Sequence, residues 1–300
     1  MEQETNSSGM DVTGVSMAFA AVLIWAGNYI AARGVADAVP ALTLSCWRWA
    51  VAALVFLPFA RKNFSADWPV LKRHPWYLFI TAFLGLGFFS VGLYTAAHST
   101  EALNMALFST TSPIFTLLLA RIFLREKLTA RRVFGIVAAL FGVLLLTVRG
   151  DFFALTTLTF YRGDLLVLAS AISFAGYTVL LRFKPKGASD NGFSLCTFIL
   201  AFAMLLPFSI WELATGTEIR FSVKSCGEFA YIGICASVVA YWCWNGATRR
   251  IGAANTSVIY YSIPLFSGIL AVLFLNEPVS WVHFASGGLI LTGIVVAARP

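Results

Sequence analysis

The 300-residue chain is 59% hydrophobic and only 12% charged, with a mean hydropathy of +0.81. Soluble globular domains carry about 25% charged residues, so this composition excludes a soluble domain and indicates a protein that crosses a membrane several times. The net charge of +7 does not indicate nucleic-acid binding, because the basic residues gather in the loops on one side of the predicted spans.

Apolar segments long enough to cross a bilayer follow one another along almost the whole chain. We expect ten transmembrane helices, at residues 13–33, 41–60, 76–97, 102–124, 130–149, 164–182, 192–211, 228–248, 253–275 and 280–298. The first eleven residues contain three acidic side chains and no basic region, which argues against a cleavable signal peptide.

The basic residues are distributed unequally between the two ends of these spans. Of the 21 Lys and Arg residues, 15 fall on one side, five fall on the other, and Arg48 lies inside the second span. The positive-inside rule then places the more basic loops and both termini in the cytoplasm.

The predicted fourth span is interrupted near its middle. Pro113 follows the polar run 109–112, and a proline cannot donate to the carbonyl four residues earlier, so we expect a kink that frees the Ser109 carbonyl. The same construction recurs 151 residues later at Pro264, where the Tyr260 carbonyl would be freed. Polar backbone at this depth is tolerated only where protein or water meets it, so the two kinks predict a transport site between two halves of the chain.

The two halves repeat one another at nearly constant offsets. The recurring residues at an offset of 151 include Ala102, Asn104, Pro113, Phe123, Leu124 and Glu126, matched by Ala253, Asn255, Pro264, Phe274, Leu275 and Glu277. Each half has five spans, and an odd number gives the halves opposite orientations. We therefore expect an all-α integral membrane protein with ten transmembrane helices in two inverted five-helix repeats, the arrangement of alternating-access transporters. The expected divisions are a cytoplasmic tail at 1–12, a first repeat at 13–150, an outer loop at 151–163 and a second repeat at 164–300.

Glycines mark the fifth and tenth spans. Gly135 and Gly142 lie in the fifth, and Gly287 and Gly293 lie in the tenth. Small faces let membrane helices pack closely, so we expect these two spans to form an outer scaffold.

Several stretches resemble the drug/metabolite transporter superfamily, in particular its EamA-type ten-helix members. They are IWAGNYIAAR (24–33), CWRWAVAAL (46–54), SPIFTLLLARIFLREKL (112–128) and SIPLFSGILAVLFLNEPVS (262–280). Within the superfamily the chain is most similar to the aromatic amino acid exporters of the YddG type in Gram-negative inner membranes. The resemblance implies a multi-pass transporter of the bacterial inner (plasma) membrane, and it also places an arginine on the second helix.

Ionisable residues are scarce within the spans. Arg48 is the only basic one well inside a span, and we interpret it as a structural charge, satisfied by backbone carbonyls or extended toward the outer interface. Glu126 and Glu277 lie at span ends facing opposite sides, where they would cap helices or hold gates. No Asp or Glu lies near the middle of a span, so we expect transport down the substrate gradient without a proton gradient. Backbone carbonyls at the two breaks could hold an ion, so the sequence leaves ion coupling open.

Aromatic residues fall into two groups by depth. Those at span ends are explained as interfacial belts: Trp47, Trp49, Trp76, Tyr77, Trp211, Tyr231 and Trp281. Deeper aromatic residues share helical faces with polar residues that lipid would penalise, so we expect these faces to line the pocket. The candidate substrate-binding residues are Trp25, Asn28, Tyr94, Ser109, Phe174, Tyr177, Tyr241, Trp244, Asn245 and Tyr260.

Such a pocket suits a zwitterionic amino acid, with an aromatic side chain stacking on Trp or Tyr. Phosphorylated substrates would need several basic residues within the spans. A cationic drug, another hydrophobic small molecule and the different function of a lipid scramblase remain open alternatives. Paired acids, metal-ligand clusters and hydrolase motifs are absent from the sequence at this depth, so we expect a transporter rather than an enzyme, with no cofactor, no metal and no nucleic-acid partner. The sequence leaves open whether the protein is a monomer.

Overall fold

The computed structural model describes residues 11–36, 38–99, 105, 108–148, 150–153, 162–216, 219–220, 222–275 and 281–298, and every regular element in these ranges is helical. The first half contains α1 (Val12–Val35), α2 (Ala41–Leu71), α3 (Pro75–Ala82), η1 (Phe83–Phe88), α4 (Phe89–Ala97), α6 (Ser112–Phe123) and α7 (Ala130–Thr147). The second half contains α8 (Arg162–Leu180), η3 (Leu181–Phe183), α9 (Asp190–Ala214), α10 (Val223–Ala230), η4 (Tyr231–Val239), α11 (Ala240–Ile251), α12 (Ala253–Ile259), η5 (Tyr260–Ser262), α13 (Ile263–Leu275) and α14 (Trp281–Ala298). The prediction of an all-helical membrane fold is confirmed.

Seven helical segments in the described ranges are long and apolar enough to cross a bilayer. They are Val12–Ala32, Ala41–Leu71, Pro75–Ala97, Ala130–Thr147, Arg162–Phe183, Asp190–Ala214 and Ser225–Ile251. The predicted fourth and ninth spans are divided into shorter helices, and α14 is also shorter by this measure. The total of ten spans therefore stays a prediction.

The second helix is longer than its predicted span. We expected it to end at residue 60, but α2 continues to Leu71 through Pro58 and Pro69. The added turns contain Arg61 and Lys62, which are both exposed. As a result α2 brings Asp67 to the loop before α9, where it makes contacts described below.

The broken helices restart at their prolines. Residues 110 and 111 form a turn, and α6 begins at Ser112, so Pro113 lies in the first turn of a new helix. Pro264 likewise is the second residue of α13 and follows the single 3₁₀ turn η5. A proline in the first helical turn loses no hydrogen bond, because those N–H groups have no intrahelical partner. The break thus lies just before each proline, at the boundary between two half-helices.

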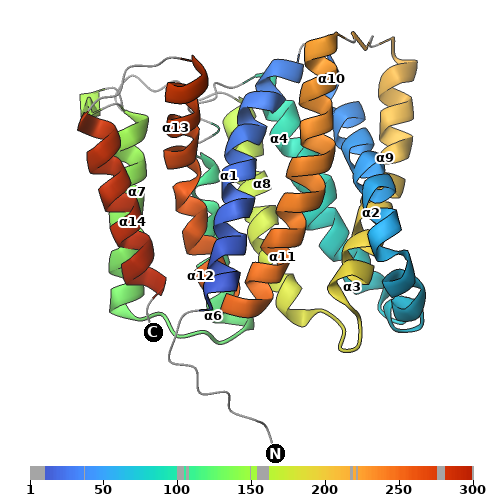
Figure 1. Ribbon diagram of the computed structural model, residues 1–300, viewed down its shortest axis with the longest axis horizontal. Helices are drawn as coiled ribbons and strands as arrows, with labels where there is room; N and C mark the ends of the chain where they lie inside the picture. Colours follow the sequence, from blue (N-terminus) through green and yellow to red (C-terminus); the bar gives the residue numbers. More distant parts are fainter. Residues whose placement is uncertain are drawn as a thin grey trace, which may run out of the picture.

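Equivalent helices of the two halves pack against each other at the two edges of the molecule. Figure 1 shows α7 beside α14 at one edge and α2 beside α9 at the other. At the α7–α14 crossing, a Cβ on Gly135 would lie 2.6 Å from the Gly293 carbonyl oxygen, and a Cβ on Gly293 would lie 2.5 Å from the Gly135 carbonyl oxygen. Only two glycines let the backbones approach this closely, which places the fifth and last helices at the periphery as expected.

The inner helices also pack symmetrically across the two halves. The first helix of each half packs on the third segment of the other, so α1 lies along α11 and α8 lies along α4 (Figure 1). Asp11 at the start of α1 pairs with Arg250 at the end of α11, while Arg182 after α8 bonds the Arg249 carbonyl at that same end. Because α1 begins where α8 finishes, the two halves run in opposite directions.

A π-helix interrupts the third segment of each half at an equivalent position. These are η1 in the first half and η4 in the second. Each holds a glycine in close contact: a Cβ on Gly85 would meet the Tyr177 ring, and a Cβ on Gly233 would meet Val51 at 2.7 Å. Wider π turns occur often at functional sites, and both of these face helices of the other half.

Carboxylates join α2 to α9 at both ends. The Ser189 N–H and hydroxyl donate to Asp67 Oδ2 at one end, and Ser189 is the N-cap of α9. At the other end, the Leu42 and Thr43 N–H groups at the start of α2 donate to Glu212 near the end of α9. Each helix therefore supplies the anion that caps the N-terminus of its partner.

Candidate transport site

Six buried aromatic residues meet where the two halves join, and we refer to them as the aromatic cluster. They come from α1, α8, α11 and η5 and are Trp25, Phe174, Tyr177, Tyr241, Trp244 and Tyr260. None exposes more than 7% of its surface. All six were predicted as substrate-binding residues, and the structure brings them into one continuous set of ring contacts.

Trp25 is the centre of the cluster. Its ring centroid lies 5.3 Å from that of Phe174, 5.4 Å from that of Tyr241 and 5.2 Å from that of Trp244. The Trp25 indole N–H also donates to the Ala236 carbonyl at 3.0 Å. The side chain is thus held by several rings and one hydrogen bond.

The prediction that Trp25 and Phe174 line the substrate pocket stays a prediction, because in this conformation their rings leave no space for a substrate ring between them. The two rings meet edge to face at an interplanar angle of 85°. A third ring between them would need a separation of about 9 Å, twice the shortest usual centroid distance. The residues approach from opposite halves as predicted, but they contact each other, so the cluster is closed.

The polar tips of the cluster are bound to neighbouring helices. Tyr241 donates to the Gly85 carbonyl in η1 at 2.7 Å, and Tyr177 donates to Asn245 Oδ1 at 2.6 Å. The Trp244 indole N–H donates to the Thr178 hydroxyl at 3.1 Å. These bonds satisfy groups that would be costly to leave unpaired away from water, and they join α11 to both η1 and α8.

Arg48 is buried beside this cluster, with only 1% of its surface exposed. Its Nε donates to the Ser237 hydroxyl at 2.7 Å, and Nη1 donates to the Tyr94 hydroxyl at 2.7 Å. The Tyr94 hydroxyl in turn donates to Asn28 Oδ1 at 3.2 Å. The expected extension toward the outer interface is wrong, because the neutral groups of α1, α4 and η4 hold the guanidinium in the interior.

The two helix breaks meet through a tyrosine that the sequence reasoning missed. The Tyr29 hydroxyl lies 3.3 Å from the Tyr260 hydroxyl and is also hydrogen-bonded to Ser109. Tyr29 lies four residues after Trp25 on α1, so the two share a helical face and this spacing could have identified Tyr29. The Tyr260 carbonyl, expected to be free, accepts the Ile263 N–H within the 3₁₀ turn, because the tighter turn replaces the bond that Pro264 cannot make.

Of the seven aromatic residues expected in interfacial belts, four are exposed, Tyr77 and Tyr231 are half-buried, and one is fully buried. Trp47, Trp76, Trp211 and Trp281 are exposed. Trp49, however, is fully buried; its ring stacks on Phe198 and meets the edge of Tyr241 at 5.0 Å. Trp49 lies on the face of α2 that packs against α9 and α11, whereas Trp47 lies on the exposed face.

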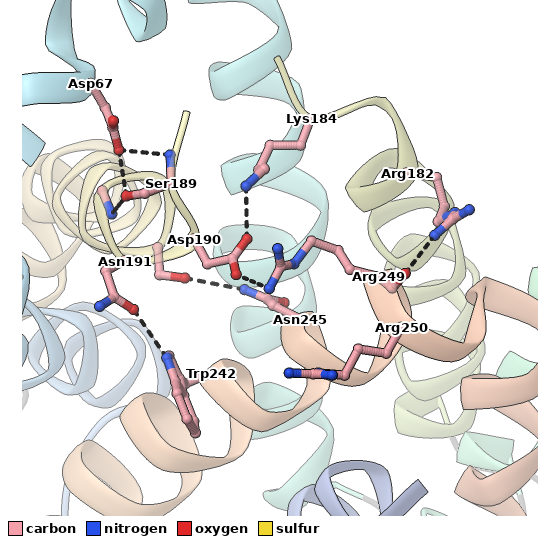
Figure 2. A network of polar contacts seen from close by, with 12 residues as sticks. Asp67, Arg182, Lys184, Ser189, Asp190, Asn191, Trp242, Asn245, Arg249 and Arg250 are labelled. Carbon is pink, nitrogen blue, oxygen red and sulfur yellow. Dashed lines mark hydrogen bonds and ion pairs between the residues drawn. The ribbon is translucent and has the colours of Figure 1, made fainter. Parts of the chain in front are cut away.

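A second polar network closes the end of the molecule that holds the start of α1 (Figure 2). Asp190 at the start of α9 pairs with Lys184 at 2.7 Å and with Arg249 at the end of α11. Figure 2 shows both cations pointing at this one carboxylate. We refer to these three residues as the Asp190 network, and it joins α9, α11 and the loop after α8.

Further bonds surround the Asp190 network. Arg182 donates to the Arg249 carbonyl at 3.0 Å, and the Trp242 indole N–H donates to Asn191 at 3.1 Å (Figure 2). Asn245, a predicted site residue, donates to the Ser194 hydroxyl and so connects this end with the aromatic cluster. The sequence signal for this network is that Asp190 is an acid in an otherwise basic loop.

The charged form of Lys184 is disfavoured in this position. Burial and, to a smaller extent, the nearby charge of Arg249 lower the pKa of Lys184 to about 8, while Asp67 acts in the opposite direction. The ion pair with Asp190 therefore forms at a desolvation cost.

Glu126 belongs to another contact at the same end. Its carboxylate lies 3.5 Å from Arg132 at the start of α7, and Arg132 also donates to Asn255 on α12 at 2.8 Å. Glu126 thus connects helices of both halves rather than lining the aromatic cluster, as expected. Its counterpart Glu277 lies outside the described residues. In the described ranges no group of three or more His, Cys, Asp or Glu could hold a metal ion.

Comparison with known proteins agrees with this geometry. The sequence profile of the EamA-like transporter family matches the chain twice, over residues 12–148 and 161–299. The chain belongs to the EamA-like transporter family. It is therefore a multi-pass membrane transporter of a small molecule, embedded in lipid, with the two-repeat fold of that family.

Individual relatives of this EamA-like transporter are distant. The uncharacterized transporter YyaM of Bacillus subtilis (strain 168) is 24% identical over 85% of this chain and 83% of its own length. A probable terminal-alkyne amino-acid exporter of Streptantibioticus cattleyicolor is 24% identical over 93% of this chain and 91% of its own length. One solved crystal structure matches with a TM-score of 0.77 at 19% identity, covering 95% of this chain and 96% of that one. This last similarity shows the fold alone.

Proposed function

We propose that this transporter exports neutral amino acids, aromatic ones preferred, from the cytoplasm across the bacterial inner membrane by alternating access. The observation that carries the proposal is the aromatic cluster between the inverted halves, flanked by hydroxyl, amide and backbone groups and by Arg48. These groups complement an aromatic ring joined to a zwitterion. The relative named as an amino-acid exporter supports the same substrate class.

The position of the cluster supports alternating access. Rings from α1 and α8, the first helices of the two inverted halves, meet at Trp25 and Phe174. Opening toward either side needs these helices to separate, which would expose the rings to a substrate. The Asp190 network joins α9 and α11 at the end rich in basic residues, so we assign it as the cytoplasmic gate in its closed form.

The charge distribution supports a neutral substrate. Arg48 is the one basic side chain buried near the cluster in the described part of the chain, whereas phosphorylated substrates need several. Within the described spans, no carboxylate contacts the cluster residues. We therefore propose transport down the substrate gradient without proton coupling.

The lipid scramblase alternative finds less support. A recess of about 450 Å³ opens between α13, α14 and α7, and leucine, isoleucine, phenylalanine and glycine dominate its lining. A lipid headgroup would need a polar path, and His283 is the only polar residue in that lining as described.

The test is selectivity in proteoliposomes. Trp25→Ala should raise the activation free energy of phenylalanine transport by about 1–2 kcal/mol more than that of threonine transport, which is the size of one aromatic contact and its buried area. Phe193→Ala is the matched control, because Phe193 is equally buried but contacts Tyr77 instead of the cluster. Initial rates are normalised to inserted protein. Equal fractional losses for both substrates in Trp25→Ala would assign Trp25 to packing alone.

A further inference from the structure

Arg48 carries a buried positive charge whose contacts are all neutral. Its hydrogen-bond acceptors are the Ser237 and Tyr94 hydroxyls and the Ala236 carbonyl, and no carboxylate contacts it within the described residues. A guanidinium stays protonated at every physiological pH. Burying such a charge without an anion is unfavourable, and intramembrane charges of this kind are typically functional.

The guanidinium also has donors to spare. It has five N–H groups, and its described contacts use three of them. The bond from Nη2 to the Ala236 carbonyl is 3.5 Å long, at the limit for a hydrogen bond. The rings of Trp49 and Tyr94 lie 4.6 and 5.4 Å from Cζ and add cation–π attraction, but neither ring accepts the remaining N–H groups in the guanidinium plane. Nη2 is therefore the weakly satisfied nitrogen, and Nη1 keeps a second N–H beyond the one that it donates to Tyr94.

A single carbonyl connects the Nη1–Nη2 edge to the aromatic cluster. The Ala236 oxygen accepts both Arg48 Nη2 and the Trp25 indole N–H. A carboxylate bound to the Nη1–Nη2 edge would therefore place the rest of its molecule beside Trp25. Asn28 Oδ1 accepts from Tyr94 on the same side, which leaves it a lone pair for an ammonium group.

We propose that Arg48 binds the carboxylate of the transported amino acid, an assignment that rests on the proposed function and names its anionic contact. Two parallel N–H···O bonds from a planar guanidinium match a carboxylate in geometry as well as in charge. The same buried charge repels cationic drugs, so it selects against one of the alternative substrate classes. Arg48 is thus a specificity-determining residue rather than a structural charge.

The first test uses the wild-type protein in proteoliposomes, with unlabelled compounds competing against radiolabelled phenylalanine. 3-Phenylpropionate keeps the ring and carboxylate and should compete. Phenylalaninamide keeps the ring and amino group but has a neutral amide, and it should compete at least about tenfold less well than phenylalanine, the effect of losing charged hydrogen bonds. Equal competition by phenylalanine and phenylalaninamide would overturn the role of Arg48 while leaving aromatic transport intact. Absence of any phenylalanine transport would instead overturn the proposed function.

The second test uses variants. Arg48→Gln should remove the discrimination between phenylalanine and phenylalaninamide, and Arg48→Lys should retain part of it, because a lysine keeps the charge but not the paired geometry. Tyr94→Phe keeps the arginine but removes the acceptor of its Nη1, and it should change the discrimination between phenylalanine and phenylalaninamide only slightly. Tyr77→Phe loses a hydroxyl bonded to the Leu180 carbonyl and is the matched control. Unchanged discrimination in a folded Arg48→Gln protein would overturn the proposal. If Arg48→Gln does not fold, the wild-type competition still decides.

Discussion

Asp190 offers the sharpest test of the cytoplasmic gate. Asp190→Asn keeps the shape of the side chain and removes its charge, so both ion pairs, with Lys184 and with Arg249, are lost together. The variant should shift the transporter toward states that are open to the cytoplasm, because these two pairs join α9, α11 and the loop after α8 only when the gate is closed.

The magnitude follows from the exposure of the pairs. The Lys184 and Asp190 side chains are 14% and 23% exposed, but the Arg249 side chain is 41% exposed, so solvent screens the second pair. Partly exposed pairs contribute about 0.2–1 kcal/mol each. A total of about 1 kcal/mol corresponds to about a fivefold rise in the ratio of open to closed gate.

The assay is thiol labelling from the cytoplasmic side. Thr248 lies behind the network on α11, is fully buried, and its hydroxyl makes no hydrogen bond in the described structure, so Thr248→Cys is a mild reporter. In a background without the five native cysteines, a membrane-impermeant reagent added to inside-out vesicles should label Asp190→Asn about five times faster. Asp151→Asn removes a carboxylate from the opposite end and is the matched control. A labelling rate equal to that of the control would refute the assignment of the gate.

Three further predictions follow from charge, packing and hydrogen bonding. The pKa of Lys184 is about 8 in the closed network, and we expect an ordinary pKa once the gate opens into water. The open state then binds more protons between about pH 8 and 10, so its population should fall as the pH rises. The labelling rate of the reporter, divided by the rate in a Lys184→Gln protein, should therefore fall over this interval, and a flat or rising ratio would contradict the mechanism. Gly135→Val should lower the free energy of unfolding by about 1–3 kcal/mol through overpacking. Gly288→Ala should be neutral, because its Cβ would meet nothing within 4 Å. Thermal unfolding in detergent compares the two variants, and equal melting temperatures would argue against the glycine crossing. Trp25→Phe should lower stability by about 1–3 kcal/mol, because the indole N–H bond to the Ala236 carbonyl and part of the ring contacts are lost. Full wild-type stability in the same assay would show that the indole bond contributes nothing.

Much of the fold could be predicted because it depends on local composition and on repetition. Apolar segments, the unequal loops and the recurring Pro113 and Pro264 indicated a helical membrane protein made of two opposed halves. The glycines Gly135, Gly142, Gly287 and Gly293 indicated that the fifth and tenth spans form an outer scaffold, but not that these two spans contact each other. These signals survive in one sequence because each depends on neighbours in the chain.

The less predictable features depend on contacts between distant segments. The π-helices η1 and η4 leave no clear sequence signal, and they set which carbonyl faces Arg48 and Trp25. Depth alone suggested an interfacial Trp49, although packing against Phe198 buries it. The sequence predicted which aromatic residues lie together, but it could not show that their rings contact each other in this conformation instead of enclosing a substrate.

The most direct test of the account is uptake of radiolabelled phenylalanine, threonine and a cationic dye by liposomes that contain the purified protein. Each is measured with and without an imposed pH gradient. The account predicts that phenylalanine moves fastest, that threonine moves more slowly, that the dye is excluded, and that phenylalanine equilibrates without accumulating when the pH gradient is imposed. Rapid transport of the dye, or uphill accumulation of phenylalanine that an uncoupler abolishes, would contradict it.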